Sequence, residues 1–265
     1  HLLSGGTDLL VQRRAGRRQG ALADISGLRD APAPVTVSEK TITLSALAPL
    51  TVLATELTRA REQNGLTGPT NARELNGLVE AISCFASGQI RNRATLGGNL
   101  ANASPAADCV PPLVAAGAVA RLRGPDGRRD LPVEDLATGP GRTALRPGEW
   151  IEAIDVPRTP ATTSGFRKIA GRQALAISVV SLAWQWTADS EGNLSGVRLS
   201  AGAVAPTVIR CRTAEQALEG RVPTPDLARA IQHDIAPIDD LRAGADYRRR
   251  ALEGALVEAL MRRNQ

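Results

Sequence analysis

The sequence has 265 residues, a length that allows two modest domains with hydrophobic cores of their own. Hydrophobic residues make up 43% and charged residues 22% of the chain, which is ordinary for a soluble globular protein. Aromatic residues are scarce at 2%, so we expect cores built from alanine, valine, leucine and isoleucine. The net charge of +5 does not indicate nucleic-acid binding, because the basic residues are scattered and no stacking aromatics lie between them.

The three cysteines, Cys84, Cys109 and Cys211, lie far apart in the sequence, and none belongs to a CxxC pair. This spacing predicts neither a disulfide framework nor a zinc, iron–sulfur or other metal site, and unpaired thiols favour a cytoplasmic location. No apolar run approaches the ~18 residues that a membrane span requires, and no signal peptide is visible. The sequence begins at His1 inside a predicted strand, so we expect that an N-terminal segment precedes it.

Hydrophobic periodicity predicts the elements of the first 160 residues. Strands are expected at residues 1–4, 21–25, 41–46 and 150–156. Helices are expected at residues 49–61, 71–86 and 108–116. Strands at residues 119–123 and 129–133 flank Pro125-Asp126-Gly127, which is a hairpin signal. Residues 87–107 show no clear period, and a stretch of that length in a compact domain is usually functional or disordered.

Residues 159–164 are rich in proline, threonine and serine and predict a linker with a domain boundary. Beyond them, strands are expected at residues 166–169, 178–186 and 194–202, and helices at residues 213–219, 225–234 and 246–262. The last helix carries a regular apolar stripe. Its cationic run, Arg248-Arg249-Arg250, is interpreted as a solvated face or a subunit contact.

The first candidate binding segment is Ser4-Gly5-Gly6-Thr7-Asp8, at the end of a predicted strand. Two glycines let the backbone come close to a ligand, and successive N–H groups together with the Thr7 hydroxyl could bind an anion. Taken alone, the segment is explained better as a simple strand-to-helix turn. The dinucleotide fingerprint GxGxxG is absent.

The second candidate segment, Thr95-Leu96-Gly97-Gly98-Asn99, repeats the hydroxyl and the glycine pair and adds a side-chain amide. Ser104-Pro105 and Asp108 follow closely. Two such loops could grip one pyrophosphate from both sides, since backbone donors suit its negative charge. Two unrelated turns explain the same residues, and the residues alone leave both interpretations open.

Residues 89–100 (QIRNRATLGGNL) and 103–108 (ASPAAD) closely resemble the central motif of the FAD-binding subunits of molybdenum hydroxylases. That family includes the flavin subunits of xanthine dehydrogenase and aerobic carbon monoxide dehydrogenase. Residues 2–9 resemble its first glycine loop, and residues 166–181, 202–212 and 240–250 resemble its C-terminal domain. The likeness keeps the order of the motifs from end to end. The family usually has further residues before the first loop, forming a strand and a helix.

The resemblance implies an α+β fold with two domains. A PCMH-type FAD-binding domain, made of two subdomains with the flavin between them, is expected over residues 1–160. A C-terminal domain of the carbon monoxide dehydrogenase flavoprotein type, an antiparallel sheet packed with helices, is expected over residues 162–265.

The resemblance also implies the residues of a cofactor site. The diphosphate and the ribityl chain are expected to be wrapped by the first loop, which comprises Leu2, Leu3, Ser4, Gly5, Gly6, Thr7 and Asp8. The diphosphate is expected to be bound from the opposite side by the second loop, with Thr95, Gly97, Gly98 and Asn99. Without a histidine beside either loop, His1 apart, we expect FAD to be held non-covalently.

Other positions of the site are implied with less detail. Asp108 is expected to hydrogen-bond a sugar hydroxyl, and Ile151 and Lys168 to lie near the flavin or its ribityl edge. The same set includes Phe85, Ala86, Ala101 and Ser104. Core packing remains the main expected role of Phe85 and Ile151, and Lys168 could simply be a surface lysine.

In this family a molybdopterin large subunit hydroxylates the substrate, and electrons pass through an iron–sulfur small subunit to the flavin subunit. The resemblance implies that this chain receives those electrons and hands them to NAD, oxygen or another acceptor, with no catalytic residue of its own. A stand-alone flavin-dependent oxidoreductase of the same superfamily is the alternative. A non-catalytic nucleotide-binding protein of the same fold is a third possibility.

Overall fold

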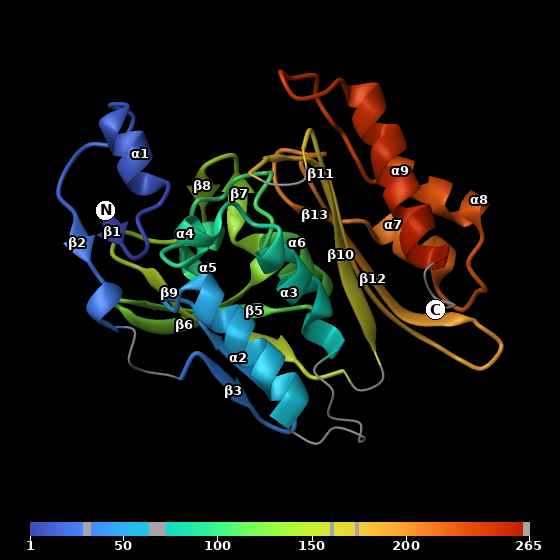
Figure 1. Cartoon of the computed structure of the whole chain (residues 1–265), viewed down its shortest axis with the longest axis horizontal. Coiled ribbons are helices and arrows are strands. Elements are labelled where there is room, and N and C mark those ends of the chain that lie inside the picture. Colours follow the sequence, from blue (N-terminus) through green and yellow to red (C-terminus); the bar gives the residue numbers. More distant parts are fainter. Residues whose placement is uncertain (29–32, 64–72, 160–161, 173–174, 262–265) are drawn as a thin grey trace.

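The computed structural model describes the whole chain except residues 29–32, 64–72, 160–161, 173–174 and 262–265 (Figure 1). Its elements up to residue 157 are β1 (Leu2–Leu3), α1 (Leu9–Arg14), β2 (Ala23–Asp24), η1 (Ser26–Leu28), β3 (Val35–Val37), β4 (Thr41–Ser45), α2 (Leu50–Gln63), η2 (Arg73–Leu75), α3 (Asn76–Ser83), α4 (Gly88–Arg91), α5 (Leu96–Ala101), α6 (Val110–Ala115), β5 (Val119–Gly124), β6 (Gly127–Pro132), η3 (Val133–Asp135), β7 (Ala137–Gly139), β8 (Arg142–Thr143) and β9 (Trp150–Pro157). The elements that follow are β10 (Thr163–Ala170), β11 (Ser178–Ala188), β12 (Leu194–Gly202), β13 (Ile209–Arg210), α7 (Arg212–Leu218), α8 (Pro225–Ala228), η4 (Arg229–His233) and α9 (Ala245–Met261).

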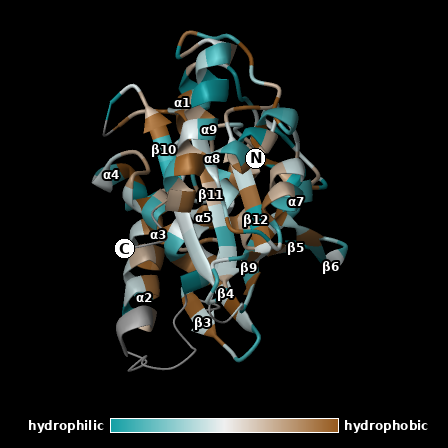
Figure 2. Cartoon of the chain, turned by 90° about the vertical axis from the view of Figure 1, so that its right-hand side faces the viewer, coloured by the Kyte–Doolittle hydropathy of each residue, from teal (hydrophilic) through white to brown (hydrophobic). Residues whose placement is uncertain are grey.

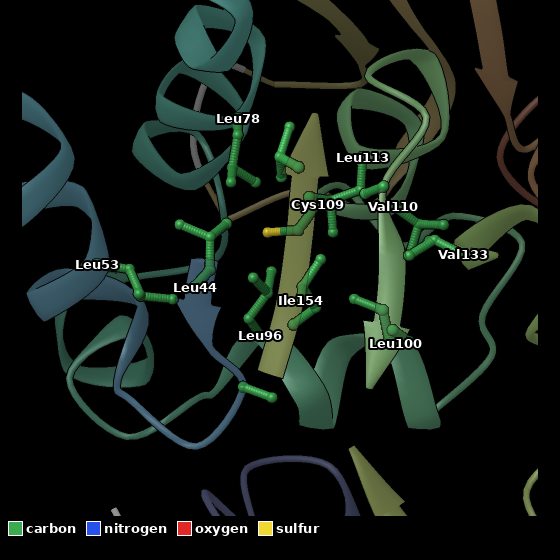
Figure 3. Close-up of a cluster of buried hydrophobic side chains, with 14 of the residues drawn as sticks. Leu44, Leu53, Leu78, Leu96, Leu100, Cys109, Val110, Leu113, Val133 and Ile154 are labelled. Atoms are coloured by element: carbon green, nitrogen blue, oxygen red, sulfur yellow. The ribbon is translucent and has the colours of Figure 1, made fainter. Parts of the chain in front are cut away.

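The N-terminal part is built on a five-stranded antiparallel sheet with the strand order β3-β4-β9-β5-β6. Alternation in β4 buries Ile42 and Leu44 completely, and they pair in register with Val156 and Ile154 of β9. The side chains of Leu53, Leu78, Leu96 and Ile154 converge on this core from α2, α3, α5 and β9 (Figure 3). As expected from the composition, this core contains no fully buried aromatic side chain among the described residues.

A smaller unit lies beside this sheet at the N-terminal end. β1 pairs in parallel with β2, and α1 follows β1 after the first glycine loop. None of the α1 residues is buried, and the apolar residues at its start are followed by polar and cationic ones (Figure 2). The predicted hairpin is confirmed as β5 and β6, whose pairing ends at Gly124 and Gly127.

The C-terminal part is an antiparallel sheet with the order β10-β11-β12-β13, covered by helices on both faces (Figure 1). Alternation in β11 directs Val180, Leu182 and Trp184 into a core shared with α7 and α9. The intervening Ala183 faces α3 and α6. Helices α3 and α6 therefore lie between the two main sheets, and they contribute both to the N-terminal core and to a small cluster with β10 and β11.

The α+β fold is confirmed, and several predicted elements differ in extent. Of the helix expected at residues 71–86, residues 71 and 72 lie outside the described residues, residues 73–75 form the 3-10 turn η2, and α3 ends at Ser83. Residues 87–107, which show no period, contain the short helices α4 and α5. The helix expected at residues 225–234 divides into α8 and η4. No helix of the described residues is long and apolar enough to cross a membrane.

The interpretation of Arg248 as part of a solvated face is wrong. Its side chain is only 2% exposed. The guanidinium donates to the carbonyl oxygens of Val179 at 2.5 Å and Ala203 at 2.9 Å, and to Asp240 Oδ1 at 2.6 Å. Charge alone cannot reveal this burial, because the three acceptors come from three other segments. Arg250 of the same run is exposed.

Gly165 of β10 allows the closest approach within the C-terminal sheet. A Cβ at this position would lie 2.2 Å from Cζ2 of Trp184, its partner in β11. We expect Gly165→Ala to lower the free energy of unfolding by about 1–3 kcal/mol through overpacking. Gly254→Ala in α9, where an added Cβ meets no atom within 4 Å, should stabilise the helix by about 0.5–1 kcal/mol. Chemical denaturation measures both, and equal stability of Gly165→Ala and wild type would contradict the packing.

Candidate cofactor site

A cavity of about 1050 Å³ opens between the N-terminal unit, the segment from Phe85 to Asp108 and the C-terminal sheet. Its volume lies at the upper end of the ~300–1000 Å³ range of ligand pockets. The cavity is lined by Leu2 to Leu9 on one side and by residues of α4 and α5 on another. The wall is completed by residues 148–151, before and within β9, and by residues 175–177, before β11.

The two glycine loops meet in this cavity, backbone against backbone. A Cβ on Gly5 would lie 2.2 Å from the carbonyl oxygen of Arg93 and 3.0 Å from Cα of Ala94. Gly6 has a φ of +73°, a left-handed conformation that disfavours other residues. Gly5 is therefore required because the contact leaves no room for a side chain, and Gly6 is required because of its left-handed backbone conformation.

The first loop presents polar groups that have no partner among the described residues. The backbone N–H groups of Gly5, Gly6 and Thr7 donate to no acceptor among the described residues. The hydroxyl oxygen of Ser4 is buried and also lacks a hydrogen-bond partner. Unpaired polar groups are costly unless a ligand or water satisfies them. The chemistry of this donor set fits the diphosphate of the expected cofactor.

The second loop is the N-terminal turn of α5. Thr95 Oγ1 accepts a hydrogen bond from the N–H of Gly98 at 3.1 Å, as an N-cap should. Gly97 packs on Ala46, whose carbonyl oxygen would lie 2.9 Å from an added Cβ. Gly98 is exposed to the cavity, and only Thr95 Oγ1 would lie within 4 Å of its Cβ. Gly98 is helical and has no positive φ, so its backbone conformation does not require glycine. We attribute the glycine to the cavity space that a side chain would fill.

Asn99 of α5 and Asp108, which lies between α5 and α6, both line the cavity. The Asn99 side-chain oxygen accepts from the Cys109 N–H at 3.3 Å, and its amide nitrogen donates to no acceptor among the described residues. The Asp108 carboxylate accepts from Lys168 Nζ and from Ser178 Oγ, both at 2.6 Å. Lys168 is 10% exposed, so the surface interpretation of this lysine is wrong.

The cavity brings together every residue of the predicted site except Lys168, which lies behind Asp108 and contacts it directly. Phe85 and Ile151 line the cavity and also pack in the N-terminal core, as expected. Sequence reasoning missed other lining residues, among them Gln12, Arg18, Asn102, Trp150, Leu175, Ala176, Ile177 and Arg242. No local pattern marks them, since they come from separate segments that only the fold brings together.

Ionisable groups around the cavity are largely engaged with one another. The hydrogen bond from Arg129 lowers the pKa of Glu149 to about 2, so this lining carboxylate stays charged near neutral pH. Burial raises the pKa of Cys84 to about 11, so its thiol stays protonated. No group of three or more His, Cys, Asp or Glu side chains that could hold a metal occurs in the described part of the chain.

Comparisons with known proteins agree with the resemblance noted in the sequence. Residues 1–159 match the family described as the FAD binding domain in molybdopterin dehydrogenase. Residues 166–262 match the family described as the CO dehydrogenase flavoprotein C-terminal domain.

Individual relatives are similar over most of the chain. The xanthine dehydrogenase FAD-binding subunit of Escherichia coli O157:H7 is 32% identical over 254 residues, covering 93% of this chain and 82% of the relative. The 6-hydroxypseudooxynicotine dehydrogenase complex subunit alpha of Paenarthrobacter nicotinovorans is 30% identical, covering 98% of this chain and 87% of the relative. A carbon monoxide dehydrogenase structure from Hydrogenophaga pseudoflava aligns with a TM-score of 0.86 and 27% identity, covering 98% of this chain and 88% of that one.

The exposed Gly98 offers a direct test of the cavity. We expect Gly98→Val to raise the dissociation constant of FAD at least tenfold, about 1.4 kcal/mol, because the new side chain would occupy cavity space. FAD titration measures the affinity, and thermal melting should show a retained fold. The matched control is Gly88→Val at the start of α4, where a Cβ meets no atom within 4 Å. Wild-type FAD affinity in Gly98→Val would contradict the site.

Proposed function

This chain belongs to the family of FAD-binding subunits of molybdenum hydroxylases, and from that premise we propose that it relays electrons from an iron–sulfur partner subunit to an external acceptor. It is an FAD-dependent oxidoreductase subunit. Bound FAD supplies the redox centre, and the protein supplies binding, orientation and electrostatics. The observation that carries the proposal is the set of unpartnered donors of Ser4, Gly5, Gly6 and Thr7 at the contact between the two glycine loops.

The residue roles follow from where the donors lie. The N–H groups of the first loop hold one side of the diphosphate, and the N-terminal turn of α5 faces it from the other side with the amide nitrogen of Asn99. Asp108 offers an oxygen to a sugar hydroxyl while Lys168 and Ser178 keep its carboxylate in place. Phe85 and Ile151 supply apolar wall, since both line the cavity from the core.

The proposed partners are an iron–sulfur small subunit and a molybdopterin large subunit. Three observations support them: Cys84, Cys109 and Cys211 are all free; two of these thiols are buried; and a relative is named as the subunit of a dehydrogenase complex. Electrons must then come from a cluster on another chain and leave to NAD, oxygen or another acceptor. The free thiols also support a location in the cytoplasm.

We propose that the two hydrophobic cores correspond to two domains. Residues 1–160 form the FAD-binding domain, and residues 162–265 form the C-terminal domain. The boundary falls at residues 160 and 161, which lie outside the described residues. The buried ion pair of Asp108 with Lys168, at 2.6 Å, joins the two parts beside the cavity.

Purification from the native host tests the partnership. We expect the chain to co-purify with an iron–sulfur subunit and a molybdopterin subunit, and the substrate of that complex to bleach the flavin absorbance. The isolated FAD-loaded chain should not be reduced by the same substrate, because substrate oxidation is assigned to the molybdopterin subunit. If the isolated chain oxidises a small substrate with ordinary turnover, the stand-alone flavoenzyme is the correct interpretation instead.

A further inference from the structure

The cationic groups of the cavity lie on two different parts of the chain. Among the described lining residues, only Arg18 and Arg242 carry a guanidinium. Arg18 belongs to the N-terminal unit and donates to Gln12 Oε1 at 3.1 Å. Arg242 belongs to the segment before α9, which reaches over the ends of β10 and β11 (Figure 1). It is thus separated in the chain from both glycine loops.

Arg242 is held by a carboxylate that two guanidinium groups share. Its Nη1 lies 2.9 Å from Asp240 Oδ2, and Arg248 Nη2 lies 2.6 Å from Asp240 Oδ1. Burial raises the pKa of Asp240, but hydrogen bonds from the N–H groups of Arg242 and Ala243 and from Arg248 outweigh it and leave the pKa lowered. One negative charge therefore faces two positive charges, and the group has a net positive charge.

Only one of the two guanidinium groups is accessible to a ligand. The Arg248 side chain is 2% exposed and is saturated by Val179, Ala203 and Asp240. The Arg242 side chain is 44% exposed and lines the cavity. The excess positive charge is consequently presented to the cavity by Arg242.

Asp240 binds both the backbone and the side chain of Arg242, and apolar side chains lie in the same cavity. Asp240 Oδ1 also accepts from the N–H of Arg242 at 2.7 Å, which ties the backbone to the same carboxylate. Leu175 and Ile177 line the same cavity and are 55% and 58% exposed. An oriented cation beside exposed apolar side chains is suited to a molecule that carries both an anionic group and an apolar body.

The acidic residues of the cavity do not cancel this charge. Asp108 is paired with Lys168, and Glu149 is paired with Arg129. Asp8 keeps its negative charge, because its hydrogen bond comes from the neutral amide of Gln12, but it lies in the N-terminal unit, where Arg18 binds the same Gln12. The charge at Arg242 thus remains available to attract an anion.

We propose that Arg242 is the residue by which this chain recognises an anionic electron acceptor. The proposal rests on the proposed function, since it concerns the molecule that takes electrons from the bound cofactor. The N–H groups of the glycine loops are assigned to the cofactor diphosphate, and the Arg242 guanidinium, which is paired with Asp240 through Nη1 and is 44% exposed, serves a second anion.

The test uses the full chain loaded with FAD, reduced chemically and mixed with acceptors in a stopped-flow instrument. We expect Arg242→Met to lower the second-order rate constant for ferricyanide, a multiply charged anion, by about tenfold. Its rate with a neutral water-soluble quinone should stay within about twofold of wild type, as expected where no charge is steered. Arg242→Lys should recover part of the ferricyanide rate. Arg250→Met, which removes the same charge from an exposed position outside the cavity, is the matched control.

A second measurement does not depend on electron transfer. Calorimetric titration of the oxidised, FAD-loaded chain with ferrocyanide should show binding to wild type and at least tenfold weaker binding to Arg242→Met. Absence of binding to wild type, or equal losses with ferricyanide and quinone, would overturn the proposal. So would a fall in FAD affinity in Arg242→Met, because Arg242 would then belong to the cofactor site. Failure of the wild-type chain to take up FAD would instead contradict the proposed function.

Discussion

The cavity depends on a single backbone contact, in which Gly5 rests against the carbonyl oxygen of Arg93. Any side chain at Gly5 would lie 2.2 Å from that oxygen and would force the two loops apart. The contact brings the end of β1 next to the start of α5, although the two segments are some ninety residues apart in sequence. It leaves a row of backbone donors without an acceptor in the described part of the chain, which is the feature that a diphosphate can use.

A second constraint joins the two halves of the protein at the same place. Asp108 comes from the segment between α5 and α6, whereas Lys168 and Ser178 come from β10 and β11. With its carboxylate saturated on one side by the C-terminal sheet, Asp108 is fixed where it lines the cavity. The C-terminal part therefore shapes the site itself, and Arg248 fixes the start of β11 by donating to Val179.

Regular patterns allowed the sequence to predict the strands that alternate, such as β4 and β11, and the motif resemblance predicted some of the residues that line the cavity. The end of the helix expected at residues 71–86 could not be predicted, because Ala86 has a φ of +40°, a conformation that alanine rarely adopts and that no local pattern marks. The burial of Arg248 and the presence of Arg242 at the cavity depend on distant segments, and periodicity carries no information about these.

The most direct test of the account is the identity and linkage of the chromophore in the purified full chain. The account predicts a yellow protein whose flavin spectrum is lost from the pellet on acid precipitation, with FAD recovered in the supernatant in stoichiometric amount. A colourless protein that takes up no FAD on titration would contradict the assignment of the cavity. Flavin that stays with the precipitate would contradict non-covalent binding by the glycine loops.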